Sequence, residues 1–189
     1  MNIKNIVTEK KTGKLSFLGR EVILYTLDIP RCDDEKSFLN DFFALTAENY
    51  LKYLEDLLEK ELAPKMKAMI ENSKRSRDIR NALGIPINAA LSWSYTFFKE
   101  RYLSLLCESR LAYANGKKVF TIRALCIDTE TMVLKKARDI SKKASCGKYN
   151  FYIKGAKMYT FGRNFAVCED DGRQYGDIMK ISARKIDNI

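Results

Sequence analysis

Histidine is absent from this chain of 189 residues. Because histidine is the side chain that changes charge near neutral pH, its absence excludes Ser-His-Asp and Cys-His nucleophile systems and most zinc hydrolases. The sequence also lacks the glycine-rich phosphate loop, the dinucleotide-binding glycine turn and the nucleophile elbow. We therefore expect a protein that is not an enzyme, with no catalytic residues and no cofactor.

Closely spaced cysteines are also missing, since the five cysteines stand far apart and form no Cys-x-x-Cys pair. This pattern predicts reduced thiols rather than a disulfide framework or a zinc site. Cys107 and Cys126 are expected as diagonal neighbours on the buried face of a hairpin, where we favour a small apolar role over a redox pair. The carboxylates of residues 169–171 lack the ligand spacing of a calcium loop, so no metal site is predicted.

Long apolar runs are absent too, because none approaches the roughly 18 residues that a membrane-spanning helix needs. The N-terminal residues are polar and do not resemble a secretion leader. As written, the sequence predicts a cytoplasmic chain without a membrane span. A leader removed upstream of Met1 would instead predict an extracytoplasmic protein.

Positive charge is in excess, with 34 Lys and Arg against 24 Asp and Glu and a net charge of +10 at pH 7. Such a surface is compatible with an anionic partner, nucleic acid among them. Two basic groups are candidates for this contact: Lys65, Lys67, Lys74, Arg75, Arg77 and Arg80, and then Lys135, Lys136, Arg138, Lys142 and Lys143. The alternative, which we favour for the first group, is the solvated face of a helix whose apolar side is buried.

Residues 87–128 alternate apolar and polar side chains with a period of two over three segments, which predicts a β-meander with one buried face. Asn115-Gly116 predicts a two-residue turn that sets Leu111 opposite Phe120 and Glu108 opposite Arg123. The apolar residues of the first two segments lie on the same face of the sheet only under one condition. The numbers of any two residues that pair across the strands must sum to an even value. We therefore predict a connection of odd length near Glu100, or a bulge.

A long helix is predicted from residue 35 to about residue 62, with Asp33 and Asp34 as N-cap candidates. Its apolar residues recur every three or four positions: Leu39, Phe42, Phe43, Tyr50, Tyr53, Leu54, Leu57 and Leu58. Pro64 should kink or break it. The helix is expected to cover the meander and to bury five of its side chains: Trp93, Leu105, Leu111, Phe120 and Ile122.

The whole chain is predicted to be one α+β domain, an antiparallel β-meander sheet packed on one long helix with a short-stranded C-terminal block. Residues 15–86 form a hairpin and the helical cover, with Pro30 ending the second hairpin strand. Residues 87–146 form the meander, and residues 147–189 the C-terminal block, with strands near 150–153, 157–161, 164–168 and 178–181.

Tyrosines and basic residues of the C-terminal block are the candidate partner-binding surface, because they offer large contact area with hydrogen-bonding ends. These residues are Lys148, Tyr149, Tyr152, Lys154, Lys157, Tyr159, Arg163 and Tyr175. The alternative is that half of them pack on the sheet.

The order of several segments resembles one family. These segments are Ile29 to Phe43, Leu91 to Tyr95, Tyr102 to Leu105, Tyr113 to Gly116 and Ile127 to Thr131. Together they look like the paired uncharacterised domains outside the membrane in lysozyme-sensing anti-sigma factors and in the non-catalytic region of peptidoglycan deacetylases, over roughly Leu15 to Phe161. The resemblance implies the fold and a binding-module character, without deacetylase activity or any transferred functional residue.

The predicted function is therefore a non-enzymatic binding or sensing module that recognises a protein or a cell-envelope component. The alternative is an intracellular nucleic-acid-binding protein that uses the basic helical surface.

Overall fold

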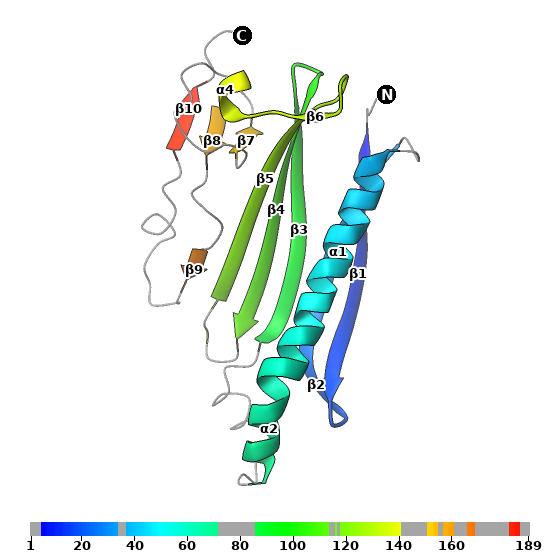
Figure 1. Cartoon of the computed structure of the whole chain (residues 1–189), viewed down its shortest axis with the longest axis vertical. Helices are drawn as coiled ribbons and strands as arrows, with labels where there is room; N and C mark the ends of the chain where they lie inside the picture. Colours follow the sequence, from blue (N-terminus) through cyan, green and yellow to red (C-terminus); the bar gives the residue numbers. More distant parts are fainter. Residues whose placement is uncertain are drawn as a thin grey trace.

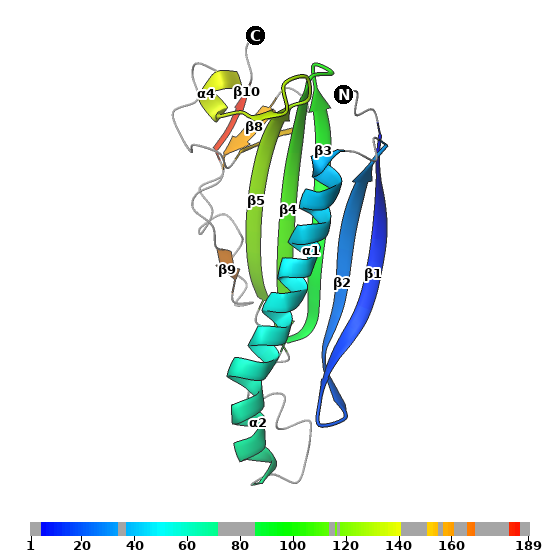
Figure 2. The ribbon, with the colours of Figure 1, turned by 45° about the vertical axis from the view of Figure 1, so that its right-hand side comes forward.

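The computed structural model describes residues 5–33, 37–71, 86–113, 116, 118–140, 151–154, 157–160, 166–168 and 182–185. A seven-stranded sheet has the order β1-β2-β3-β4-β5-β6, with β9 also beside β5. A second, three-stranded sheet has the order β10-β8-β7. The long helix α1 lies across one face of the main sheet, and the small sheet lies near the end of β3, β4 and β5 (Figures 1 and 2). The predicted α+β class is confirmed.

The strands are β1 Ile6–Phe17, β2 Arg20–Cys32, β3 Pro86–Phe98, β4 Tyr102–Tyr113, β5 Lys118–Asp128, β6 Val133–Leu134, β7 Phe151–Lys154, β8 Lys157–Thr160, β9 Ala166–Cys168 and β10 Ser182–Lys185. The helices are α1 Phe38–Asp56, the π-helical turn η1 Leu57–Leu62, α2 Ala63–Ile70 and the short α4 Ala137–Ile140. Neighbouring strands are antiparallel except β2 and β3, which run parallel because α1 carries the chain back across the sheet. The organisation as a single domain stays a prediction.

The helix begins later than predicted, at Phe38, and its N-cap is Ser37. The Ser37 hydroxyl accepts the backbone N–H of Leu39 at 3.3 Å. Asp33 is engaged elsewhere, since its carboxylate accepts the backbone N–H of Asn5 at 3.3 Å. The expected cap at Asp33 was therefore wrong, and Asp34 lies outside the described residues.

Of the kink or break predicted at Pro64, the structure shows no break, since α1, η1 and α2 follow one another without a gap. Proline has no N–H, and its ring crowds the carbonyl four residues earlier. The turn η1 widens to π geometry just before it, and the N–H of Ala63 donates to the carbonyl of Leu58, five residues back. The chain then continues as α2 with Pro64 in its first turn, where a missing N–H costs nothing.

The N-terminal hairpin is longer than predicted, because β1 begins at Ile6 and β2 passes through Pro30 to Cys32. The side of β2 opposite β1 pairs with β3 only from Leu24 to Leu27. Pro30 lies beyond that stretch, so β3 requires no donor from it.

The connection between β3 and β4 agrees with the parity prediction. Phe98 pairs with Tyr102, which leaves only Lys99, Glu100 and Arg101 between the strands. Lys99 and Glu100 both have a φ of 53°. The odd-length connection centred on Glu100 is thus confirmed.

The predicted register of β4 with β5 was wrong by one residue. Leu111 pairs with Val119 rather than Phe120, and Arg123 pairs with Cys107 rather than Glu108. Gly116 has a φ of 87°, and its N–H donates to the carbonyl of Tyr113 at 3.0 Å. The paired numbers sum to an even value, so the loop has an odd length with glycine at the left-handed position.

This register divides the meander into two buried faces. Odd-numbered residues face α1, where Leu111 packs with Leu54 and Leu57, and Leu105 packs with Phe43. Trp93 is also on this face, edge-on to the Phe43 ring at 4.9 Å between centroids. The expected burial of Leu105 and Leu111 against the helix is confirmed, while Trp93 packs on the helix but is only partly buried.

Even-numbered residues of β5 face the other way, so Phe120 and Ile122 do not pack on α1 and that part of the prediction was wrong. Cys126 packs instead with Phe151 of the small sheet. Cys107 belongs to the helix-facing core. The two cysteines therefore lie on opposite faces, contrary to the expectation that they are neighbours, although both are buried free thiols.

Two hydroxyls hold the small sheet on the outer face of the main one. Thr96 and Ser104 form a cross-strand pair between β3 and β4. Thr96 donates to the carbonyl of Ile153 in β7, and the N–H of Ile153 donates to the Ser104 hydroxyl at 2.8 Å. Strands β7, β8 and β9 lie where short strands are predicted, while β10 lies just beyond the predicted position.

Replacing Gly13 with alanine should lower the free energy of unfolding by about 1 kcal/mol, because the new methyl group overpacks a filled site. Gly13 pairs with Tyr25 across the hairpin, and a Cβ at Gly13 would overlap the Tyr25 phenol. Urea unfolding measures the effect. In a Tyr25→Leu background the same substitution should cost little, and an equal cost in both backgrounds would contradict this cause.

Candidate functional site

A groove of about 380 Å³ lies between α1 and the part of the sheet that the helix leaves uncovered. The helix contributes Thr46, Asn49, Tyr50 and Tyr53, and the strands contribute Leu91, Cys107, Ser109, Leu111, Val119, Thr121 and Arg123. Its volume falls within the range of sites that hold small organic ligands.

Two periodicities bring these side chains together. The helical residues are three or four positions apart, so they share one side of α1. The strand residues are all odd-numbered, which places them on the face that looks toward the helix. The groove is thus the unfilled edge of the same interface that forms the core.

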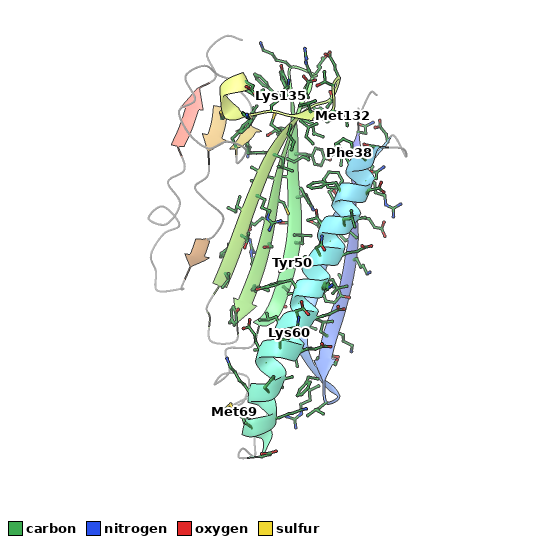
Figure 3. All side chains as sticks on the ribbon, viewed as in Figure 1. Phe38, Tyr50, Lys60, Met69, Met132 and Lys135 are labelled. Atoms are coloured by element: carbon green, nitrogen blue, oxygen red, sulfur yellow. The ribbon has the colours of Figure 1, made fainter. Side chains whose placement is uncertain are left out.

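Tyr50 forms a fixed wall of the groove and lies midway along α1 (Figure 3). Its hydroxyl donates to the carbonyl of Arg110 on β4 at 3.0 Å, and burial raises its pKa. The ring stacks on Tyr53 with 6.1 Å between centroids. Tyr53 is 48% exposed and available to a ligand.

Cys107 lies in the groove wall and is 6% exposed. Burial raises the pKa of its thiol to about 12, against a smaller opposing effect of Arg123. The thiol is therefore protonated at neutral pH, and a protonated thiol is a poor nucleophile.

Arg123 is the charged residue of the groove, and sequence reasoning placed it on the wrong face. Shifting a strand register by one residue moves every side chain to the other side of the sheet. Glu108, its expected partner, instead accepts from Arg110 at 3.0 Å. Among the residues that the structure describes, no carboxylate lies within ion-pair distance of Arg123.

A second polar cluster surrounds Asp128 at the end of β5, near Met132 and Lys135 in Figure 3. The buried carboxylate accepts from Arg101 at 2.8 Å and from Lys135 at 3.2 Å. The N–H groups of Glu130 and Thr131 add bonds at 3.1 and 3.4 Å. The side-chain hydrogen bond from Arg101, with the smaller contributions of these other donors, holds the pKa of Asp128 far below its usual range.

This cluster has a structural role, because its acceptor oxygens form hydrogen bonds with other groups of this chain. The hydroxyl and the N–H of Thr129 both donate to the carbonyl of Arg101, at 2.7 and 2.8 Å. The cluster thereby ties the connection between β3 and β4 to the turn after β5. The turn that the sequence predicts at residues 128–131 lies one residue later, at 129–132, because Asp128 is the last residue of β5.

The predicted C-terminal surface is only partly visible. Tyr152 is buried and Lys154 is exposed, while Lys157 and Tyr159 lie on β8. Tyr152 is therefore not available on the surface as expected. The rest of this set lies outside the described residues: Lys148, Tyr149, Arg163 and Tyr175.

The predicted basic groups are also only partly described. Lys65 and Lys67 are exposed on α2, whereas Lys135 is engaged with Asp128. Lys136 is half-buried. The other members, Lys74, Arg75, Arg77, Arg80, Lys142 and Lys143, lie outside the described residues, and for Arg138 only the backbone is described.

In the part of the chain that the structure describes, no cluster of three or more cysteine or carboxylate side chains is arranged to hold a metal ion. None of the helices described is long and apolar enough to cross a bilayer.

No family model matches the sequence. A comparison with curated proteins finds no match either. Among solved structures, the fold is similar to a DUF3298-family protein from Bacteroides fragilis, with a TM-score of 0.58 and 11% sequence identity over 85% of this chain and 84% of that one. At this identity the likeness concerns the fold, which is that of an uncharacterised domain family.

Proposed function

We propose that this chain is a non-enzymatic binding module that holds its ligand in the groove beside α1. The observation that carries the proposal is the lining of the groove. An exposed tyrosine and an arginine lie among uncharged polar and apolar side chains. Within the described part of the chain, the arginine has no carboxylate partner and none of the lining residues is a carboxylate. Such a surface supplies contact area and hydrogen bonds.

The same lining argues against chemistry at this site. General acid-base catalysis needs a group that exchanges protons near neutral pH. Burial raises the pKa of both Tyr50 and Cys107, which moves them away from that range. With no histidine in the chain, the groove has the means to bind and orient a molecule but not to transfer its protons.

The class of ligand is proposed from the sequence resemblance. The domains that the chain resembles lie outside the membrane, so a cell-envelope component or a protein partner is the proposed ligand. The fold likeness to a DUF3298-family protein is compatible with such a module. Nucleic acid is the second candidate, favoured by the positive net charge and by exposed Lys65 and Lys67 on α2.

Binding to soluble peptidoglycan fragments tests the proposal. Trp93 is the single tryptophan and pairs with Cys107 of the groove wall, so its fluorescence reports occupancy. Ser109→Phe fills the groove and should weaken binding at least tenfold. Ser94→Phe, at an exposed position of β3 that does not line the groove, should leave the affinity unchanged.

Asn49→Phe repeats the test from the helix side, at an exposed position where the substitution leaves the core intact. Equal affinities for wild type and both groove variants would overturn the groove as the site. Binding of duplex DNA that falls steeply between low and moderate salt, without binding of peptidoglycan fragments, would favour the second candidate.

A further inference from the structure

We propose that the groove binds a small amphipathic carboxylate, whose negative charge pairs with Arg123 and whose ring or apolar body lies against Tyr53 and the apolar residues of the groove. This inference rests on the proposed function and names its ligand class. Its three supports are the unpaired charge, the mixed lining and the limited volume.

The first support is the place of Arg123 among the arginines. Arg31, Arg101 and Arg110 each pair with a carboxylate of this chain, at 3.2, 2.8 and 3.0 Å. Arg20 and Arg123 are both exposed, and Arg123 is the one of these two that lines the groove. Arg123 has no such partner among the described residues, although it lies on the face of β5 that otherwise packs toward the helix. Guanidinium groups bind carboxylates through two parallel hydrogen bonds, so an external carboxylate complements it.

The second support is the distribution of the other lining residues. Ser109 and Thr121 share the inner face with Arg123 and offer hydroxyl groups. Burial raises the pKa of Tyr53, so its phenol stays protonated and can donate. Apolar contacts come from Leu91, Leu111 and Val119. A charged head and a less polar body are therefore both accommodated.

The third support is the size of the groove and the number of charged residues that line it. A groove of about 380 Å³ encloses a small molecule rather than a folded partner. Among the described residues of its lining, Arg123 is the one cation. A nucleic acid would require several cations along its backbone, and a cationic ligand would be repelled, so a monoanion is the best complement.

Matched pairs of ligands test the inference. The first pair is 4-phenylbutyrate and 4-phenylbutyramide, and the second is N-acetylmuramate and N-acetylglucosamine. If the groove accepts the chemical class to which an acid belongs, that acid should bind at least tenfold more tightly than its neutral partner. A preference in the first pair alone indicates an aryl or alkyl acid, and a preference in the second alone an acidic sugar.

Substitutions of Arg123 separate a specific contact from general charge. Arg123→Gln should abolish the preference for the acid, and Arg123→Lys should retain part of it, because lysine keeps the charge but not the bidentate geometry. Arg20→Gln removes the same charge from an exposed position at the start of β2 and should leave the preference intact. Circular dichroism checks that each variant is folded.

Equal binding of acid and neutral partner in both pairs would overturn the inference, as would equal loss in Arg20→Gln and Arg123→Gln. These failures differ from failure of the proposed function. If Ser109→Phe still weakens binding of peptidoglycan fragments while acids show no preference, the groove is the site but its ligand is not recognised as a carboxylate.

Discussion

Replacing Leu111 with alanine should lower the free energy of unfolding by about 2–5 kcal/mol, measured by urea denaturation. Leu111 is 4% exposed and packs with Leu54 of α1 and Leu57 of η1 in the interface between the helix and the sheet. The substitution removes buried methyl groups and leaves a cavity. Because Leu111 also lines the groove, part of that cavity opens to solvent, which favours the lower half of the range.

Leu45→Ala is the matched control, since it makes the same substitution on α1 at a position that is 55% exposed. Its effect should stay within about 0.5 kcal/mol, as is usual for surface sites. A loss below about 0.5 kcal/mol for Leu111→Ala would contradict the assignment of odd-numbered residues to the buried face.

Replacing Asp128 with asparagine should cost about 2–4 kcal/mol at neutral pH. The buried carboxylate accepts from Arg101, Lys135 and two backbone N–H groups. The asparagine amide has the same shape but presents its own donors to these groups. It leaves Lys135 without this anion and leaves Arg101 with only the exposed carboxylate of Glu130 among the pairs described. Urea denaturation measures the change.

Glu130→Gln is the control for this prediction. Glu130 also pairs with Arg101, at 3.2 Å, but its side chain is 64% exposed. Solvent screens such a pair, so its loss should change the free energy of unfolding by less than about 1 kcal/mol. Equal effects of the two substitutions would show that burial of Asp128 does not determine the outcome.

The contribution of Asp128 should also depend on pH. Its folded-state pKa is lowered, chiefly by Arg101, so the native state binds fewer protons than the unfolded state in acid. The stabilisation is fully present above the unfolded pKa of about 4 and is lost as the pH falls below it toward the folded pKa. The difference between wild type and Asp128→Asn should therefore shrink from pH 7 to about pH 3, and a constant difference would contradict this origin.

Local patterns were sufficient to predict much of the main sheet. The parity argument at Glu100 succeeded because both β3 and β4 have their apolar residues at odd positions, and only an odd connection joins them on one face. At β5 the predicted face was wrong, because Phe120 and Cys126 are buried on the face opposite α1. A strand that is covered on both sides has apolar side chains on both faces, and the sequence pattern does not show which of them face the helix.

The candidate site depended on that missing information. Arg123 was assigned to a polar outer face because the two-residue loop at Asn115-Gly116 shifted the register by one. The role of Tyr53 at the groove required the rotation of α1 about its axis, which places it at the edge of the interface rather than in the core. An odd length for this loop was the one signal that would have assigned Arg123 to the correct face of the sheet.

The sequence by itself determined the elements, because alternation, helical spacing and turn residues act over a few residues of chain. It predicted the α+β class, the meander, the long helix and, to within one residue, the turn after β5. Only the tertiary structure decided the register of β5, the passage through Pro64 and the packing of the small sheet through Thr96 and Ser104. These features depend on contacts between segments far apart in the chain, so the groove exists only where the helix leaves the sheet uncovered.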